Sequence, residues 1–522
     1  MTRFWSRSAA VAIGCALACA APSLAQAATT GDFDGDGHSD LAVGAPADSV
    51  RGQPSAGAVN IIYGSAGDGL RSAGDQQFTQ DTPGVRGRAD AHDRFGATLA
   101  TGDFDADGYG DLVVGAPAED VSGVEAAGVA QVFYGGPSGL TVRDRLFGQG
   151  FEGIAGTREP EQNFGSALVA GDFDGDGHDD VAIGVRDESV GGAAGAGAVN
   201  VLYGSGRGLQ AARNRIWTQN SRGIKGVAGR IHHFGAALAA GDLDADGRDD
   251  LAIGVPGGRI AGASAAGAVS VLYGSASGVS ARDQLWSQGA RGIKGAAEAH
   301  DRFGWSVAMG DFDQDGDDDL AVGAPLEDLS GAANAGAVSV LYSVPGGLGS
   351  ADEMVHQADR GIKGAPEEGD RFGTTLAVRD FERDFEDDLA IGVPFEDLDG
   401  RFDAGAVAVV YGSEDSGIHA RDDFWHQRAG GIAGQLESFD DFGSALAVGD
   451  FDGDRRGDLA VGVPRDSVGA FPNAGAVNVL YGASGGLQTV DAQLWTQGTA
   501  GIGGAVGDDR FGARLASGTP AG

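Results

Sequence analysis

The chain has few cysteines, few basic residues and no long hydrophobic run. Its 2 cysteines are Cys15 and Cys19, so no disulfide can cross-link the rest of the chain. No later segment approaches the roughly 20 consecutive apolar residues that a membrane helix needs. The 36 Lys and Arg residues stand against 75 Asp and Glu, and the net charge of -39 argues against binding to nucleic acid or to an anionic membrane surface, because both need basic patches.

The N-terminal segment has the pattern of a secretory signal. Arg3 and Arg7 precede an apolar stretch, and Ala25-Gln26-Ala27 has the small-x-small form of a cleavage site. We therefore expect residues 1–27 to be a signal peptide and residues 28–522 to be secreted into the extracellular space. A lipid-modified Cys19 is the alternative, but Ala16-Leu17-Ala18 before it makes a poor lipoprotein site.

The rest of the chain is a repeat. The motif Gly-Asp-Phe-Asp-Gly-Asp-Gly-His-Ser-Asp-Leu-Ala-Val-Gly-Ala-Pro, which starts at Gly31, returns in altered form with a period of about 70 residues. Each copy also contains a Phe-Gly pair, a segment close to Gly-Ala-Val-x-Val-x-Tyr-Gly, and a segment that ends in Gln, usually after an aromatic residue. The first Asp of the seven copies stands at positions 32, 103, 172, 242, 311, 380 and 450.

Each of the four elements of a copy is expected to be a short strand. Their apolar and β-branched runs are bounded by Gly, Pro, Asp and Ser, and no helical periodicity is sustained. Four strands repeated seven times predict an all-β fold, a seven-bladed β-propeller over residues 28–522. The last segment, 509–516, is a Phe-Gly strand without a following Asp loop, and the first copy lacks a preceding Phe-Gly strand. We therefore expect one blade to combine both ends of the chain and to close the ring.

The Asp-rich loops predict calcium sites. Carboxylates at loop positions 1, 3, 5 and 9 converge in a tight turn, a carbonyl at position 7 adds a further oxygen, and Gly at position 6 permits positive φ. About five loops are intact, and their predicted Ca²⁺ ligands are Asp32, Asp34, Asp36, Asp40, Asp103, Asp105, Asp107, Asp111, Asp172, Asp174, Asp176, Asp180, Asp242, Asp244, Asp246, Asp250, Asp311, Asp313, Asp315 and Asp319. The alternative is a set of hydrogen-bonded Asx turns without metal.

Copies six and seven depart from this pattern. Phe385 and Arg455 stand where the other loops have Gly, so we expect weak or empty metal sites there. Arg455 could replace the ion by pairing with the loop carboxylates.

The Phe-Gly pair, the Asp loop and the following Gly-Ala-Pro, as in Gly44-Ala45-Pro46, resemble the FG-GAP repeat of integrin alpha-subunit propellers and their bacterial relatives. The resemblance covers essentially the whole chain after residue 27. It implies calcium loops between the first and second strands on the lower face, and partner binding by loops of the upper face. On this basis we expect a monomeric, non-catalytic adhesion or binding module for an extracellular protein or glycan. A lectin-like propeller is the alternative. A polysaccharide lyase or hydrolase is less favoured, because an enzyme should break the repeat with unique residue clusters.

One basic feature recurs before the Phe-Gly strands of three successive blades. We consider it a candidate patch for an acidic ligand, against the alternative that these charges only solvate a loop. Its residues are Arg222, Lys225, Arg291, Lys294, Arg360 and Lys363. We expect the repeated residues Trp217, Trp286, Trp425 and Trp495 to be anchors of the core. We expect His232 and His233 to lie in a solvated loop.

Overall fold

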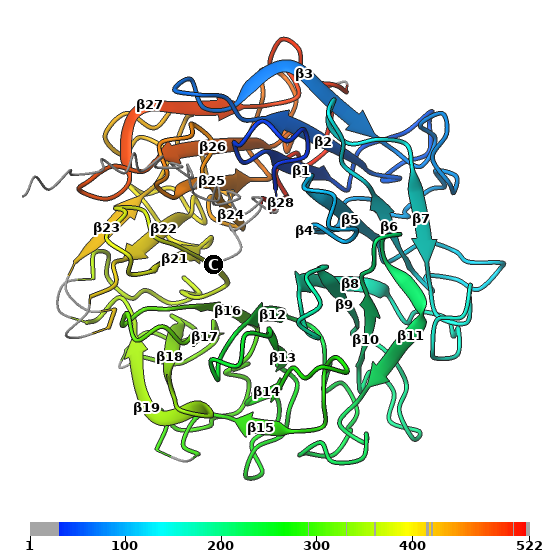
Figure 1. Cartoon of the computed structure of the whole chain (residues 1–522). Coiled ribbons are helices and arrows are strands. Elements are labelled where there is room, and N and C mark those ends of the chain that lie inside the picture. The colour runs from blue at the N-terminus through cyan, green and yellow to red at the C-terminus, as the bar shows by residue number, and fades with distance from the viewer. Residues whose placement is uncertain are drawn as a thin grey trace, which may run out of the picture.

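The computed structural model describes residues 31–290, 292–329, 331–359, 362–413, 417–418, 421–504 and 506–517. The predicted signal segment lies outside these residues. Within them, 28 strands form seven four-stranded antiparallel sheets, which stand as blades around a ring (Figure 1). The predicted seven-bladed β-propeller is confirmed. No helix in the described segments is long and apolar enough to span a bilayer.

The strands occupy four concentric positions. The innermost strands are β4 (Thr98–Gly102), β8 (Phe164–Gly171), β12 (Leu238–Gly241), β16 (Ser306–Gly310), β20 (Thr375–Arg379), β24 (Ala445–Gly449) and β28 (Arg514–Ala516). The second strands are β1 (Leu41–Ala45), β5 (Asp111–Ala116), β9 (Asp180–Val185), β13 (Asp250–Val255), β17 (Asp319–Ala324), β21 (Asp388–Val393) and β25 (Asp458–Val463). The third strands are β2 (Ala58–Tyr63), β6 (Val129–Phe133), β10 (Ala198–Tyr203), β14 (Ala268–Leu272), β18 (Ala337–Val344), β22 (Ala406–Val410) and β26 (Ala476–Tyr481). The outer strands are β3 (Arg71–Phe78), β7 (Asp144–Phe147), β11 (Gln210–Trp217), β15 (Asp283–Trp286), β19 (Gly347–Val355), β23 (Asp422–Trp425) and β27 (Gln488–Trp495).

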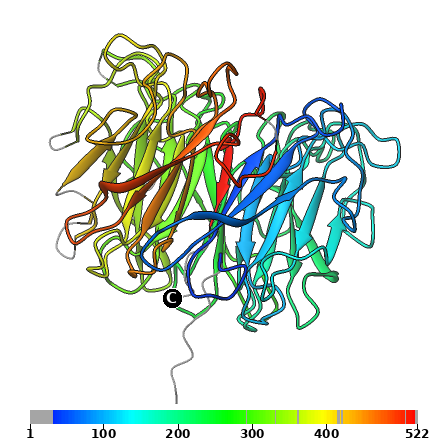
Figure 2. The same cartoon turned by 90° about the horizontal axis from the view of Figure 1, so that it is seen from above.

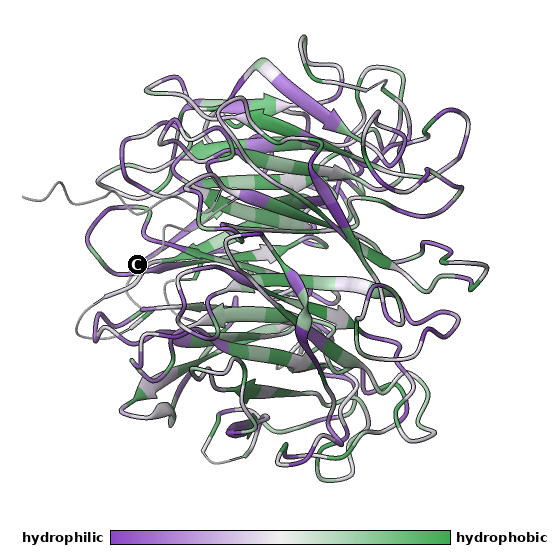
Figure 3. Ribbon diagram, turned by 45° about the vertical axis from the view of Figure 1, so that its right-hand side comes forward, coloured by the Kyte–Doolittle hydropathy of each residue, from purple (hydrophilic) through white to green (hydrophobic). Residues whose placement is uncertain are grey.

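Burial follows these positions. The second strands are buried along their whole length, while β3 and β11 of the outer strands are exposed or half-buried up to their last residue, which is buried. Figure 3 shows the same gradient, with hydrophobic strands and hydrophilic loops. A strand that is packed on both faces must be apolar throughout, which is why Leu-Ala-Val-Gly segments occupy the second position.

Glycine in the Gly-Ala-Pro motif permits close packing of neighbouring blades. A Cβ on Gly44 would lie 2.3 Å from the carbonyl oxygen of Gly96, the glycine of the next Phe-Gly pair. Gly96 itself has φ of +85°, a conformation that favours glycine. The Phe of each Phe-Gly pair is fully buried. The motif is thus a packing device between blades.

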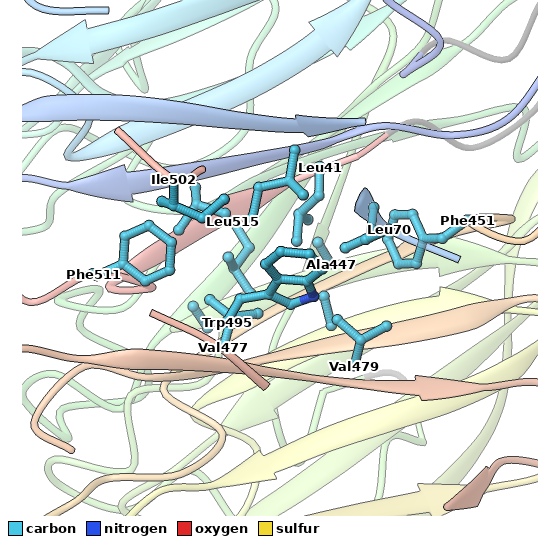
Figure 4. Close-up of a cluster of buried hydrophobic side chains, with 14 of the residues drawn as sticks. Leu41, Leu70, Ala447, Phe451, Val477, Val479, Trp495, Ile502, Phe511 and Leu515 are labelled. Carbon is cyan, nitrogen blue, oxygen red and sulfur yellow. The ribbon is translucent and has the colours of Figure 1, made fainter. Parts of the chain in front are cut away.

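The ring closes through the two ends of the chain, as predicted. The C-terminal β28 pairs antiparallel with β1, in register Ala42↔Ala516 and Val43↔Leu515, and the two segments meet in the ring (Figure 2). The core of this joint includes Leu41 from one end of the chain and Phe511 from the other, packed around Trp495 (Figure 4).

A tyrosine at the end of each third strand joins its blade to the next. Its Oη accepts a hydrogen bond from a backbone N–H of the following blade, and the seventh tyrosine bonds back to the first blade. The seven donor and acceptor pairs are Leu140 to Tyr63, Leu209 to Tyr134, Val279 to Tyr203, Leu348 to Tyr273, Ile418 to Tyr342, Leu487 to Tyr411 and Leu70 to Tyr481.

Candidate functional site

The Asp loops lie on one side of the ring, here called the Asp face. Six of them follow an innermost strand, and the first, at residues 31–40, leads directly into β1. In the first loop the Asp32 carboxylate accepts hydrogen bonds from the N–H groups of Gly35, Asp36 and Gly37, at 2.7, 3.0 and 2.8 Å. Gly37 has φ of +89°, as position 6 requires. The first carboxylate therefore holds the turn together and brings the later carboxylates toward one point.

The carboxylates at position 3 of the loops have an oxygen that a bound cation would satisfy. Asp105 Oδ2 accepts a hydrogen bond from Arg143 Nη1 at 2.7 Å, but its Oδ1 is buried and has no hydrogen-bond partner in the described part of the chain. The same oxygen is orphaned in three other intact loops, in Asp174, Asp244 and Asp313. A buried carboxylate oxygen without a partner is costly, and a hard cation would satisfy it.

In each intact loop, three carboxylates offer oxygen atoms that lie within 4.8 Å of one another. The clusters are Asp32, Asp34 and Asp36; Asp103, Asp105 and Asp111; Asp172, Asp174 and Asp180; Asp242, Asp244 and Asp246; and Asp311, Asp313 and Asp315. The donor set consists of hard oxygens, and it fits calcium better than softer metals.

The position-9 aspartates have a second role that the sequence did not reveal. Asp111 accepts hydrogen bonds from the N–H of Phe104 at 3.0 Å and of Gly135 at 2.8 Å. Burial, aided by the charges of Asp105 and Asp103, raises the pKa of Asp111 to about 9. The equivalent aspartate makes the same two bonds in every copy, with Ser343 replacing the glycine in one of them. This residue therefore fastens the loop to the third strand whether or not metal is bound.

The two degenerate loops keep the turn without glycine. Phe385 and Arg455 adopt φ of 75° and 70°, and their N–H groups still bond the first carboxylate of their loops. The expected pairing of Arg455 is wrong: this side chain is exposed, and its neighbour Arg456 pairs with Asp454 at 2.6 Å. Whether these loops bind metal weakly stays a prediction.

A cavity of about 450 Å³ lies on the ring axis at the opposite face, here called the Phe-Gly face. All seven innermost segments contribute the residues that follow their Phe-Gly pairs. Trp305 lines the cavity and is 42% exposed, whereas Trp217, Trp286 and Trp495 are 7%, 2% and 7% exposed. The core role predicted for the repeated tryptophans is confirmed for these three, while Trp425, the fourth, is only half-buried against its core cluster. Trp305 is not one of the repeated tryptophans, because it follows a Phe-Gly pair and faces the cavity.

Basic side chains also line the axial cavity. His233 Nδ1 lies 3.1 Å from Asp187 Oδ1, and Arg186 Nε lies 3.6 Å from Asp187 Oδ2. Burial by itself would raise the pKa of Asp187. The hydrogen bond to His233 and the positive charge of Arg186 outweigh this effect, so the pKa of Asp187 is lowered. His233 lies in a loop as predicted, but its ring is only partly solvated, because it packs against Asp187.

Arg302 and Arg514 have no carboxylate within 4.0 Å among the described residues, unlike the arginine beside Asp187. Arg514 keeps contact with solvent in the cavity, but protein atoms surround it, and this burial lowers the pKa of its guanidinium. Two uncompensated cations therefore face the cavity of a strongly acidic protein.

The predicted basic patch has a different environment. The Lys225 Nζ lies 3.0 Å from Asp283 Oδ1, and the Lys225 N–H donates to Asp283 Oδ2 at 2.6 Å. Lys294 and Lys363 make equivalent bonds to Asp352 and Asp422 of their next blades. Arg222 is exposed, while Arg291 and Arg360 lie outside the described residues. The lysines thus join adjacent blades, and a ligand role for the six residues remains an untested prediction.

The family of the chain is shown by comparison with known sequences. The FG-GAP repeat model matches residues 25–61, 95–133, 164–202, 234–272, 303–341, 372–410 and 442–480. The chain therefore belongs to the FG-GAP repeat family, and it forms an integrin alpha-like propeller.

Two curated relatives and one solved structure give the range of similarity. The chain is 34% identical to phosphatidylinositol-glycan-specific phospholipase D of Rattus norvegicus over 163 residues, which are 31% of this chain and 18% of that protein. It is 31% identical to integrin alpha-8 of Mus musculus over 267 residues, 50% of this chain and 22% of that protein. The matches thus span about a fifth of these relatives' lengths. The structure of rhamnogalacturonan lyase YesW covers 86% of this chain and 72% of its own at 12% identity, with a TM-score of 0.37, a likeness too weak to carry an argument.

Proposed function

We propose that this protein is a secreted, calcium-stabilised and non-catalytic binding module, which acts as a monomer and takes an extracellular protein or glycan partner at its Phe-Gly face. The observation that carries the proposal is the axial cavity of about 450 Å³ at that face. Its size is within the range of small-ligand sites, and such sites combine apolar walls with a few convergent polar groups. The similarity to integrin alpha subunits supports a binding role.

Calcium would act on the opposite face as a structural ion. The carboxylates at positions 1 and 3 of each intact loop, together with the one at position 5 or position 9, would hold it, and it would supply the positive charge that the orphaned oxygens lack. Six of the loops join the innermost strand of a blade to its second strand, and the first leads directly into the second strand β1, so metal binding would stabilise the blades that surround the cavity. We therefore assign calcium to the scaffold and binding to the Phe-Gly face.

The proposal is tested by exposing the secreted chain to arrays of extracellular glycans and to envelope proteins, in millimolar calcium and after chelation. We expect saturable binding to a defined partner, a lower thermal midpoint after chelation, and no chemical change in a bound glycan. Release of shortened or unsaturated glycan products would show that the protein is an enzyme and would overturn the proposed non-catalytic role. A folded, calcium-loaded chain that binds neither class would contradict the proposal.

A further inference from the structure

Three residues of the axial cavity depart from the repeat. Trp305 follows its Phe-Gly pair at a position where the other six copies have Ala, Ser or Thr. Arg514 stands one position further on, where the others also have Ala, Ser or Thr, and Arg186 replaces a residue that is Pro in the other six. Since the three come from three different blades and line one cavity, the departures converge in space although they are far apart in sequence.

Packing does not require these larger side chains. The blades with small residues at the same positions build the same sheets, so neither the indole nor the two guanidinium groups is needed to form a blade. Trp305 also remains 42% exposed, and Arg514 lacks a carboxylate within 4.0 Å in the described chain. An exposed indole and cations without a carboxylate partner, gathered in one cavity, supply the apolar wall and the convergent polar groups that are typical of ligand sites.

The hydroxyl groups of the cavity restrict the ligand further. Thr98, Ser306 and Thr375 donate their hydroxyl protons to carbonyl oxygens of the next blade, at 2.6 to 2.7 Å. Thr374 and Ser444 donate theirs to local carbonyl oxygens, each at 2.7 Å. Each hydroxyl oxygen therefore has only lone pairs left for a ligand, and it can accept from ligand hydroxyl groups.

We propose that the axial cavity binds an acidic sugar residue of an extracellular polysaccharide, with Arg514 bonding the acidic group and Trp305 stacking on the sugar ring. This inference rests on the proposed binding function and names its ligand class. A guanidinium forms paired hydrogen bonds to a planar carboxylate, and an indole offers a flat face to sugar C–H groups. Arg302, whose guanidinium lies 5.5 Å from the Trp305 ring centroid, orients the indole and adds a second cation.

The large negative charge of the protein affects what length of acidic saccharide can bind. Repulsion from distant surface carboxylates is screened beyond about 8 Å at physiological ionic strength, whereas Arg302 and Arg514 act at contact distance. A long polyanion would lie against the acidic outer surface. We therefore expect short oligosaccharides and chain ends to bind better than the interior of a polymer.

The test uses calorimetric titration of the secreted chain in millimolar calcium. The probes are oligogalacturonates, glucuronate-containing oligosaccharides and sulfated galactose oligomers, with neutral galactose and glucose oligomers for comparison. The variants are Arg514→Ala and Trp305→Ala, which restore residues that other blades carry at the same positions. Arg88→Ala is the matched control, because it also removes one arginine and its side chain is 73% exposed.

We expect acidic oligosaccharides to bind and neutral ones not to bind. Each cavity variant should lower the affinity at least about tenfold without changing the thermal midpoint, since a charge-assisted hydrogen bond or a stacked ring contributes that much. Arg88→Ala should bind as the parent does. Bound ligand should also protect Trp305 from acrylamide quenching. Uronate and sulfate probes identify which acidic group is preferred.

Equal binding of neutral and acidic oligomers, or parental affinity in Arg514→Ala, would overturn the inference. Capture of an acidic peptide instead of any sugar would overturn it in favour of a protein ligand. If a defined partner binds and both cavity variants leave that binding intact, the proposed binding function stands and the acidic-sugar site fails. If the folded chain binds nothing, both fail.

Discussion

The interfaces between blades contain a buried carboxyl network whose protonation can be tested. At one interface Gln80 Nε2 donates a hydrogen bond to Glu119 Oε2 at 2.7 Å, while Gln80 Oε1 is buried without a partner in the described chain. Asp93 lies beside this pair and is 2% exposed. In the next copy Gln162 replaces this aspartate, and its amide donates to the equivalent oxygen of Gln149 at 2.9 Å. Asp93 and Glu119 also hydrogen-bond each other, and burial raises the pKa of both groups. We infer that this carboxyl pair holds a proton and that Asp93 uses it to satisfy the Gln80 oxygen.

The other blade interfaces can be compared at the position that Asp93 occupies. His232 stands at this position in another copy, and its Nδ1 lies 3.0 Å from Gln219 Oε1. His232 therefore lies in a loop as the sequence suggested, but its ring is half-buried. The interfaces with aspartate at this position leave the glutamine oxygen orphaned. These oxygens belong to Gln80, Gln288, Gln357, Gln427 and Gln497.

The perturbation is Asp93→Asn, which provides a permanent neutral donor. Burial raises the pKa of Asp93 from its ordinary value of 3.8 to about 6. A raised folded-state pKa means that the protonated group stabilises the fold below about pH 4, and that this contribution is lost as the pH rises toward and through 6. At about 1.4 kcal/mol per pKa unit, the loss is up to about 3 kcal/mol. Asparagine has no such loss, so the variant should gain stability relative to the parent between pH 4 and pH 7.

The assay is denaturant unfolding of parent and variant at pH 4.5 and pH 7.5, with free calcium fixed at each pH. Comparison at the same pH cancels most of the pH dependence of metal binding. Asp399→Asn is the matched control, because this aspartate lies in a different blade and its side chain is 73% exposed, and it should show no pH-dependent difference from the parent. If Asp93→Asn differs from the parent by the same amount at both values, or destabilises at both, the inferred proton is refuted.

Three further changes test other parts of the structure. Asp105→Asn should remove one calcium ion from the stoichiometry measured by calorimetry, whereas Glu382→Gln in a degenerate loop should leave the stoichiometry unchanged and affect the thermal midpoint only through its hydrogen bond from Arg421; loss of a calcium ion in both variants would contradict the difference between these loops. Tyr273→Phe removes the acceptor of the buried Leu348 N–H and should lower the free energy of unfolding by about 1–3 kcal/mol, a result that an unchanged denaturation midpoint would exclude. Lys294→Ala should reduce stability through its lost bonds across the blade interface but leave ligand affinity unchanged; loss of affinity would instead support the basic patch.

Much of the fold follows from the sequence because the repeat reports every blade seven times. The four short elements per copy become four strands, and the unmatched Phe-Gly strand at the C-terminus becomes β28 beside β1. The convergence of loop carboxylates also followed from local spacing, since residues within one tight turn are neighbours in any fold. The second role of Asp111 did not follow, because its partner Gly135 belongs to a distant part of the blade.

The candidate ligand site was predicted less well. The three lysines of the predicted patch share a sequence context, but each is bound to an aspartate of the next blade, and only the packing of adjacent blades reveals that partner. Trp305 and Arg514 carried a signal that alignment of the copies could have found: each is larger than the residues at the same position in the other six copies. Alignment alone would not have shown that both face one cavity.

The sequence by itself determined the number of blades, the strand pattern and the acidic loops, because these depend on short-range periodicity and on contacts that recur at a fixed spacing. The tertiary structure decided which side chains remain available for a partner. Closing the ring buries three of the four repeated tryptophans and bonds the repeated lysines, while it brings Arg186, Trp305 and Arg514 from three blades to one axis. Availability depends on every neighbour that surrounds a side chain, and those neighbours come from distant parts of the chain.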